Sequence, residues 1–202
     1  MNAPQSGSRS VMLTWQREVA PSLESVRLLY SAGRLRASGR IVAAANPAQG
    51  IEAFNASFNA SVERLEDAVR LLFRTTTADE ERQITLSRSE DGIWLINHGD
   101  ANTERGAFDG AIDVDIAGAV TFNALPVRRL GLHREPATHE LPVLCVSLPD
   151  LSVRLARQTY RTVSIDDGGG AVINYSEPGY TADITVDRDG MVIDFPGRAR
   201  RI

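Results

Sequence analysis

The stretch IEAFNASFNASV, residues 51–62, alternates apolar and polar side chains with a period of two. The side chains of Phe54, Ala56, Phe58, Ala60 and Val62 therefore share one face of an extended chain, with polar side chains opposite. An apolar face of this length has to be buried against other parts of the protein. The stretch thus predicts a β-strand that covers a hydrophobic core with one of its two faces.

The same period continues towards the N-terminus. Pro21 and Gly33 separate further segments in which apolar residues alternate with polar ones. These segments are expected to be strands at residues 11–19, 22–30 and 34–45.

Asp-Gly pairs mark sharp turns farther along the chain. Asp91-Gly92 and Asp189-Gly190 each lie between two alternating segments, which is typical of β-hairpins. No composition shift or linker divides the sequence. We therefore expect a mainly β protein with little helix, made of a disordered N-terminal tail at residues 1–10 and a single domain at residues 11–202.

Two segments depart from simple alternation. Residues 61–73 carry apolar side chains at helical spacing after Ser61, which occupies an N-cap position, so a helix is one interpretation. The other interpretation is a strand whose inner face carries Leu65, Val69, Leu71 and Phe73. Around Cys145, apolar side chains occupy both faces of a strand, which requires cover on both sides by packed protein or by an apolar ligand.

Composition excludes several classes of protein. The net charge of −4 argues against a nucleic-acid binder held by general electrostatics, and all 22 long cationic residues are arginine. Cys145 is the single cysteine, so an intrachain disulfide and a thiolate metal cluster are excluded. The first ten residues lack the apolar run of a secretory signal, and no segment has the apolar length of a membrane-spanning helix. We therefore expect a cytoplasmic protein without a membrane span.

Charged residues gather around an apolar run in IDVDIAGAVTFNALPVRRL, residues 112–130. Asp113 and Asp115 lie two apart, so on a strand both reach the same face. They form an acid/base or metal-binding pair, or they are carboxylates on a solvated strand face, or they are paired with nearby arginines. Arg128 and Arg129 point to opposite faces if they lie on a strand. Each of them either binds an anionic or sugar headgroup or forms a structural pair with an aspartate.

Motifs of catalysis and of cofactor binding are missing from the sequence. The spacing of the three histidines does not fit a zinc site, and no serine lies in a G-x-S-x-G turn. No glycine-rich phosphate loop precedes a helical pattern. We therefore expect a protein that is not an enzyme and that needs no metal or cofactor.

The stretch 112–130 resembles the signature of the putative glycolipid-binding protein family, a bacterial group of largely uncharacterised proteins. The residues that carry this resemblance are Asp113, Asp115, Asn123, Leu125, Pro126, Arg128, Arg129 and Leu130. It continues through Leu148, Pro149, Val153, Gln158, Tyr160, Asp187, Gly190, Val192 and residues 194–196. Weaker matches nearer the N-terminus are Trp15, Glu24, Gly39, Phe54 and residues 92–94. The chain departs from the family pattern at Val120, Phe122, Ala124 and Leu65.

The resemblance implies a single-domain curved antiparallel sheet, a spiral β-roll or half-barrel similar in shape to bacterial lipoprotein carriers. The implied function is non-enzymatic binding of a lipid or glycolipid in an apolar groove with a rim of arginine and aspartate. The expected apolar contacts are Phe54, Phe58, Leu144 and Val146. The expected polar contacts are Asp113, Asp115, Asn123, Arg128, Arg129, Gln158 and Tyr160.

Two other functions remain open at this level. One is a hydrolase or isomerase that acts on an acyl or sugar conjugate through Asp113 and Asp115. The other is a structural or protein-interaction module whose apolar face is closed by its own core or by a second copy. The oligomeric state and the natural ligand do not follow from the sequence.

Overall fold

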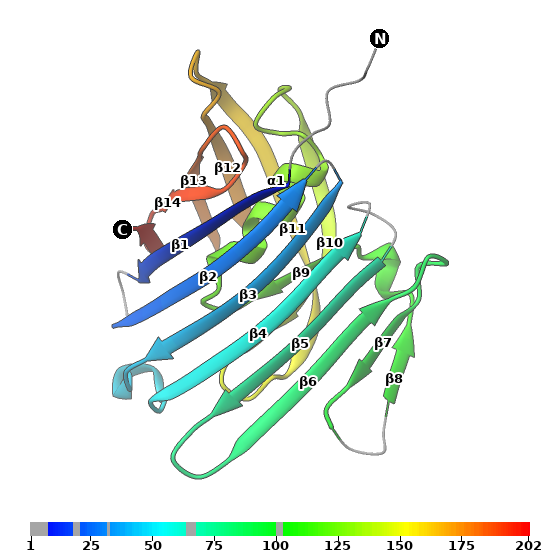
Figure 1. Cartoon of the computed structure of the whole chain (residues 1–202), viewed down its shortest axis with the longest axis vertical. Helices are drawn as coiled ribbons and strands as arrows, with labels where there is room; N and C mark the ends of the chain where they lie inside the picture. Colours follow the sequence, from blue (N-terminus) through cyan, green and yellow to red (C-terminus); the bar gives the residue numbers. More distant parts are fainter. Residues whose placement is uncertain (1–7, 18–20, 32, 64–67, 100–102) are drawn as a thin grey trace.

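One continuous sheet forms the frame of the protein. The computed structural model describes residues 8–17, 21–31, 33–63, 68–99 and 103–202. In this part of the chain, 15 strands form a single sheet in the order β8-β7-β6-β5-β4-β3-β2-β1-β15-β14-β13-β12-β11-β10-β9 (Figure 1). Successive strands pair as neighbours in β1–β8 and in β9–β15, and pairing of β1 with β15 joins these two halves. The sheet ends at β8 on one side and at β9 on the other, so it does not close on itself.

The strands vary from three to thirteen residues. The strands of the first half are β1 Arg9–Arg17, β2 Ser22–Ser31, β3 Arg34–Ala43, β4 Phe54–Glu63, β5 Ala68–Thr76, β6 Glu81–Arg88, β7 Trp94–Asn97 and β8 Thr103–Gly106. The strands of the second half are β9 Asp113–Ile116, β10 Thr138–Val146, β11 Val153–Ile165, β12 Ala171–Glu177, β13 Tyr180–Val186, β14 Val192–Phe195 and β15 Ala199–Arg201. The helical segments are η1 Pro47–Gln49, η2 Phe108–Gly110, η3 Val120–Asn123 and α1 Ala124–Arg129.

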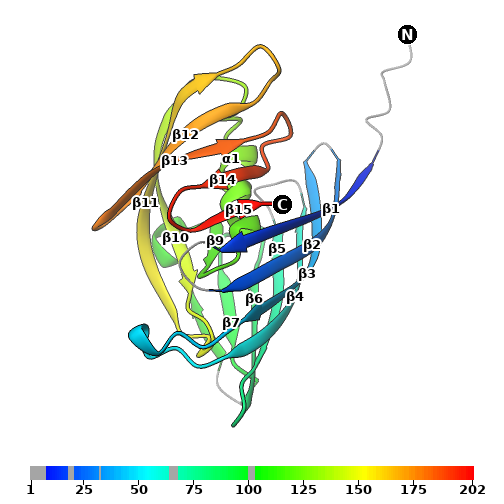
Figure 2. The same cartoon turned by 90° about the vertical axis from the view of Figure 1, so that its left-hand side faces the viewer.

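The core lies between the two halves of the curved sheet. Figure 2 shows α1 lying between the strands of the second half and the strands β1–β7. All of η3 and the first four residues of α1 are buried, and the ring of Phe122 contacts that of Phe58 at 5.2 Å between centroids. Direct bonds also connect the halves, such as the one from the Trp94 indole N–H to the Ala111 carbonyl at 2.7 Å. The concave side of the sheet is therefore filled by the protein itself.

Segment η3–α1 is part of the connection from β9 to β10. Strands β9 and β10 form the one parallel strand pair among the described residues. Parallel neighbours require such a crossover, whereas the other pairs are antiparallel. Residues Arg128 and Arg129 therefore lie in the last turn of a helix, and the interpretation of them as strand residues with opposite faces is wrong. Cations in a last turn also interact favourably with the carbonyl groups there.

The predicted fold class is confirmed: the protein is mainly β, with one short α-helix and a single curved, unclosed sheet. The turns at Asp91-Gly92 and Asp189-Gly190 connect β6 to β7 and β13 to β14. Residues 68–73 form part of β5 with Val69, Leu71 and Phe73 buried, so the strand interpretation holds there, while Leu65 lies outside the described residues. The predicted tail lies mostly outside them too, but Arg9 and Ser10 already belong to β1.

A glycine on β3 makes room for an aromatic ring of the core. Gly39 pairs with Phe58 on β4, and a methyl group at Gly39 would lie 2.2 Å from the Phe58 ring. That ring is 1% exposed, is stacked on Phe73 at 5.4 Å between centroids and also contacts the ring of Phe122, so close packing opposes its displacement.

We expect Gly39→Ala to lower the free energy of unfolding by about 1–3 kcal/mol, the usual cost of overpacking a core. Urea unfolding followed by circular dichroism measures this change. The matched control is Ser38→Ala, because Ser38 is the next residue and is exposed on the opposite face. The control should stay within about 0.5 kcal/mol of the parent protein, and an equal loss in both variants would contradict the steric explanation.

Candidate functional site

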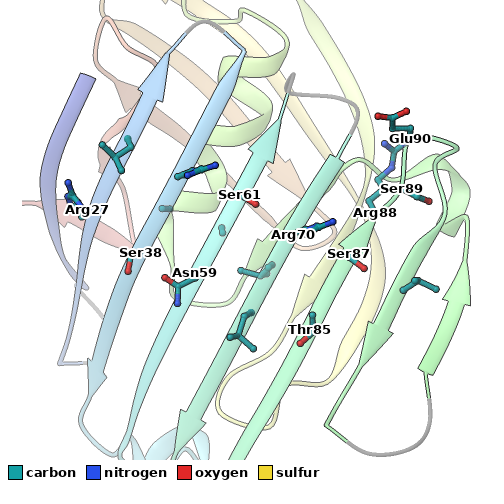
Figure 3. A pocket seen from close by; sticks show the side chains of 17 residues that line it. Arg27, Ser38, Asn59, Ser61, Arg70, Thr85, Ser87, Arg88, Ser89 and Glu90 are labelled. Carbon is teal, nitrogen blue, oxygen red and sulfur yellow. The ribbon is translucent and has the colours of Figure 1, made fainter. Parts of the chain in front are cut away.

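The outer face of the first half of the sheet carries a groove of about 950 Å³, which we call the outer groove. Side chains of β2 to β7 line it on the face turned away from the core (Figure 3). Its volume lies within the usual range of small-molecule sites. The strands that form it alternate buried and exposed residues, so the groove is built from the polar phase of the pattern that also builds the core.

Strand register places the groove residues in two rows that run across the sheet. In the first row, each residue pairs across strands with the next one: Leu29, Arg36, Ser61, Arg70, Ser87 and Leu95. The second row pairs in sequence Arg27, Ser38, Asn59, Leu72 and Thr85. Figure 3 shows Ser61, Arg70 and Ser87 following one another across the strands, with Ser38 and Asn59 beside them. Since neighbouring strands lie about 4.8 Å apart, a row that crosses six strands extends over roughly 24 Å.

The outer groove has an excess of positive charge in a chain whose net charge is −4. Arg27, Arg36, Arg70 and Arg88 line it, and Glu90 is its acidic lining residue. Within the described part of the chain, no acidic side chain forms an ion pair with Arg27, Arg36 or Arg70. Their guanidinium groups are therefore available for a phosphate, sulfate or carboxylate group.

Apolar side chains accompany these polar groups. Leu29 and Leu72 are partly exposed within the groove, and Leu95 at its far side is 42% exposed. The groove thus combines cations, hydroxyl groups, one amide and exposed leucines on one surface. These groups can hold an amphipathic molecule with a polar, anionic part.

Four of the predicted polar contacts meet inside the fold instead. The Gln158 amide donates to the Asp115 carboxylate at 2.6 Å, and the Tyr160 hydroxyl donates to the Gln158 carbonyl oxygen at 3.1 Å. The Asn123 amide donates to the Tyr160 hydroxyl at 3.5 Å. Burial raises the pKa of Asp115, against the effect of the Gln158 hydrogen bond, and raises the pKa of Tyr160 well above its usual range. This network connects η3 to β9 and β11.

The other predicted polar contacts are also engaged within the protein. Arg129 forms a buried ion pair with Asp113 at 2.7 Å between Nη2 and Oδ2. Arg128 lies 4.7 Å from the centre of the Tyr30 ring and donates to the Asp189 carbonyl. Asp113 and Asp115 thus have different partners, Arg129 and Gln158.

The predicted apolar contacts belong to the packed core. Phe54, Phe58, Leu144 and Val146 are each at most 7% exposed and lie in one cluster with the side chains of η3 and α1. Val146 also lines a smaller cavity of about 210 Å³, together with Asp115, Asn123 and Cys145. Burial raises the pKa of the Cys145 thiol to about 12, which disfavours the nucleophilic thiolate form.

The arginines of the outer groove were missed at the level of sequence, although the signal for them was present. In 34–43 every second residue is buried, and the residues between include Arg34, Arg36 and Arg40. In 68–76 the same phase carries Arg70 and Arg74. Recurring arginines on the polar phase of neighbouring strands are the pattern that would have indicated this surface.

Among the described residues, neither a metal-binding cluster nor a membrane-spanning helix is found. No group of three or more His, Cys, Asp or Glu side chains is arranged to hold a metal ion there. In the same part of the chain, no helix combines the length and the apolar character that crossing a bilayer requires.

Comparison with known proteins identifies a family and two similar folds. The family model described as "Putative glycolipid-binding" matches residues 12–201. A solved structure of a DUF1089 family protein from Pseudomonas aeruginosa is similar, with a TM-score of 0.70 and 25% identity over 92% of this chain and 95% of that one. A β-barrel-like protein of the domain of unknown function DUF1849 from Brucella abortus has a TM-score of 0.61 and 9% identity, over 99% and 98% of the two chains. No curated protein matches the sequence.

Proposed function

Because the chain belongs to the family described as "Putative glycolipid-binding", we propose that it binds a glycolipid and holds the polar headgroup in the outer groove. The observation that carries this proposal is the pair of cross-strand rows. They place arginine, serine and asparagine side chains side by side in one groove of about 950 Å³.

Each kind of side chain in the groove has a counterpart on an anionic glycolipid. The hydroxyl groups of Ser38 and Ser61 and the amide of Asn59 suit the hydroxyl groups of a sugar, since they both donate and accept hydrogen bonds. The guanidinium groups of Arg36 and Arg70 suit a charged substituent of the headgroup. Exposed leucines such as Leu95 offer contact to the first carbon atoms of an acyl chain, at about 0.8 kcal/mol for each CH₂ group buried.

The packing of the interior favours this location over the concave side of the sheet. Segment η3–α1 and the large side chains around it occupy the space between the two halves. Apart from the cavity of about 210 Å³ beside Asn123, a ligand there would have to displace side chains such as Phe122 and Leu125, which are at most 6% exposed. Binding on the outer face requires no such rearrangement.

We expect Arg70→Met to weaken binding of an anionic glycolipid about tenfold, because one charge-assisted hydrogen bond is lost. The measurement is co-sedimentation of the protein with phosphatidylcholine vesicles that contain a sulfated galactosyl lipid. The matched control is Arg161→Met, since Arg161 is an exposed arginine on β11, in the other half of the sheet. The parent protein should also bind more weakly as salt is added. Equal binding by both variants would contradict a role of the groove.

A further inference from the structure

Two pairs of arginines flank the middle strand of the outer face. Arg36 on β3 and Arg70 on β5 both pair with Ser61 on β4, one from each side. Arg40 on β3 and Arg74 on β5 pair in the same way with Ser57. Strand β4 thus has an arginine pair at Ser61 and a second arginine pair at Ser57, on the same face of the sheet.

The dimensions of this arrangement follow from strand geometry. Strands β3 and β5 are separated by two inter-strand spacings, which is about 10 Å. Two arginine side chains that start this far apart can reach the same anionic group above the serine between them. Ser57 and Ser61 are four residues apart on one strand, so the two arginine pairs are about 13 Å apart.

The second pair lies in a second groove on the same face. This groove has a volume of about 820 Å³ and is lined by Arg40, Ser57, Arg74 and other residues. The Nε group of Arg74 donates to the Gln83 carbonyl oxygen at 2.8 Å, a neutral partner. The acidic residues Glu81 and Asp150 also line this groove, but within the part of the chain that the structure describes neither forms an ion pair with Arg40 or Arg74. Among the described residues, Arg36, Arg40 and Arg70 have no acidic partner at all.

Neutral polar groups lie between the two pairs. Asn59 is the residue of β4 halfway between Ser57 and Ser61, and it is exposed on the same face. Its neighbours across the sheet are Ser38 on β3 and Leu72 on β5. The surface therefore has positive charge at two ends and an uncharged hydrogen-bonding centre.

We propose that the headgroup bound on this face carries two anionic groups about 13 Å apart, one for each arginine pair, joined by a polar spacer such as a disaccharide. This inference rests on the proposed function, because it specifies the ligand of the same face. Arg36 and Arg70 hold one anionic group and Arg40 and Arg74 hold the other. Asn59 donates to and accepts from the hydroxyl groups of the spacer.

The test compares three lipids on the same diacylated disaccharide: one with a phosphate at each end, one with a single phosphate and one with none. Each is incorporated into phosphatidylcholine nanodiscs, and binding of the full-length chain is measured by surface plasmon resonance. The bisphosphorylated lipid is expected to bind at least tenfold more tightly than the monophosphorylated lipid. The variant Arg40→Met/Arg74→Met should bind the two phosphorylated lipids equally well, and Arg161→Met should behave as the parent protein.

The outcomes separate this inference from the proposed function. If all three lipids bind equally to the parent protein and Arg36→Met/Arg70→Met weakens them all, the groove binds glycolipids but the two-anion assignment is overturned. If the bisphosphorylated lipid keeps its advantage in Arg40→Met/Arg74→Met, the second arginine pair is not the one that binds the second phosphate, and the assignment also fails. If none of the lipids binds, both the inference and the proposed function are contradicted.

Discussion

Arg129→Ala is expected to lower the free energy of unfolding by about 3–5 kcal/mol, the usual result of breaking a buried ion pair from one side. The side chains of Arg129 and Asp113 are 7% and 6% exposed, and Nη2 and Oδ2 are 2.7 Å apart. Removing the guanidinium group leaves the carboxylate of Asp113 in the interior without its cationic partner. The pair also connects the last turn of α1 to β9, so the crossover loses one of its attachments to the sheet.

Chemical denaturation of three variants measures this effect. Arg129→Ala and Asp113→Ala should each be strongly destabilised, whereas the double variant Asp113→Leu/Arg129→Met should lie close to the parent protein or above it, because it leaves no buried charge. Arg161→Met is the control for loss of an arginine at an exposed site. A loss below about 0.5 kcal/mol in Arg129→Ala, as for an exposed pair, would contradict the buried geometry. The expectation that Arg129 lies at the rim of an open groove does not fit this geometry.

The second large effect is a dependence of stability on the titration of Glu24. This residue of β2 is 1% exposed and accepts hydrogen bonds from the Val120 N–H at 2.6 Å and from the Thr121 hydroxyl at 2.6 Å. Burial raises the pKa of its carboxyl group from 4.5 to about 7, although these donors and Arg17 favour the charged form. Glu24 is thus a group that attaches η3 to the sheet and that titrates near neutral pH.

The sign of the effect follows from the direction of this pKa shift. Below pH 4.5 the carboxyl group is protonated in both the folded and the unfolded chain, and the protonated form contributes its full stabilisation to the folded state. As the pH rises towards 7, the unfolded chain releases the proton first, and the contribution is lost. The loss amounts to about 3 kcal/mol once the pH is above the folded pKa, because one pKa unit corresponds to about 1.4 kcal/mol.

Glu24→Gln removes this titration while preserving the size of the side chain. Between about pH 4.5 and about pH 8, the difference in unfolding free energy between the variant and the parent protein should change by about 3 kcal/mol in favour of the variant. Replacing one acceptor oxygen by an NH₂ group adds an offset that is the same at both pH values. Taking the difference cancels the titration of all other groups. Glu52→Gln is the control for the same substitution at an exposed glutamate. A difference that stays constant with pH, or that favours the parent protein at high pH, would contradict the raised pKa.

The alternation of apolar residues in the sequence predicts the fold well, but it predicts the outer groove poorly. Alternation in residues 51–62 indicates the strand and its buried face, because burial of every second side chain is a local requirement of a sheet that covers a core. Alternation does not show what the opposite face does. Arg36, Arg70 and Ser61 come together only through the pairing of β3, β4 and β5, and this register depends on the turns between strands.

In the interior of the protein, the sequence pattern anticipates contacts between side chains but not the local structure that carries them. The pattern around Asp113 and Arg129 correctly singles out polar side chains that contact one another, but it suggests a strand and an open rim. Residues 120–129 are helical because they form the crossover between β9 and β10 and because Glu24 accepts the first N–H groups of η3. That contact joins residues 96 positions apart, and no local pattern contains it.

Two modes of glycolipid binding differ in where the ligand would lie. A carrier that encloses its lipid would use the concave side of the sheet, which is filled in this protein by η3, α1 and aromatic side chains such as Phe58. A protein that recognises the headgroup from outside needs an exposed polar surface and a rigid sheet behind it. The outer face of β2 to β7 has both.

The most direct test of a headgroup site in the outer groove is backbone NMR of the ¹⁵N-labelled protein during titration with a short-chain anionic glycolipid. If the ligand binds in the outer groove, shifts concentrate at Ser38, Asn59, Ser61 and Arg70 and are weakened by Arg70→Met, while the amide signals of Asp115, Asn123 and Tyr160 stay unchanged. Shifts centred on Asp115, Asn123 and Tyr160, with those of Asn59 and Ser61 unmoved, would contradict this site and would place the ligand inside the sheet.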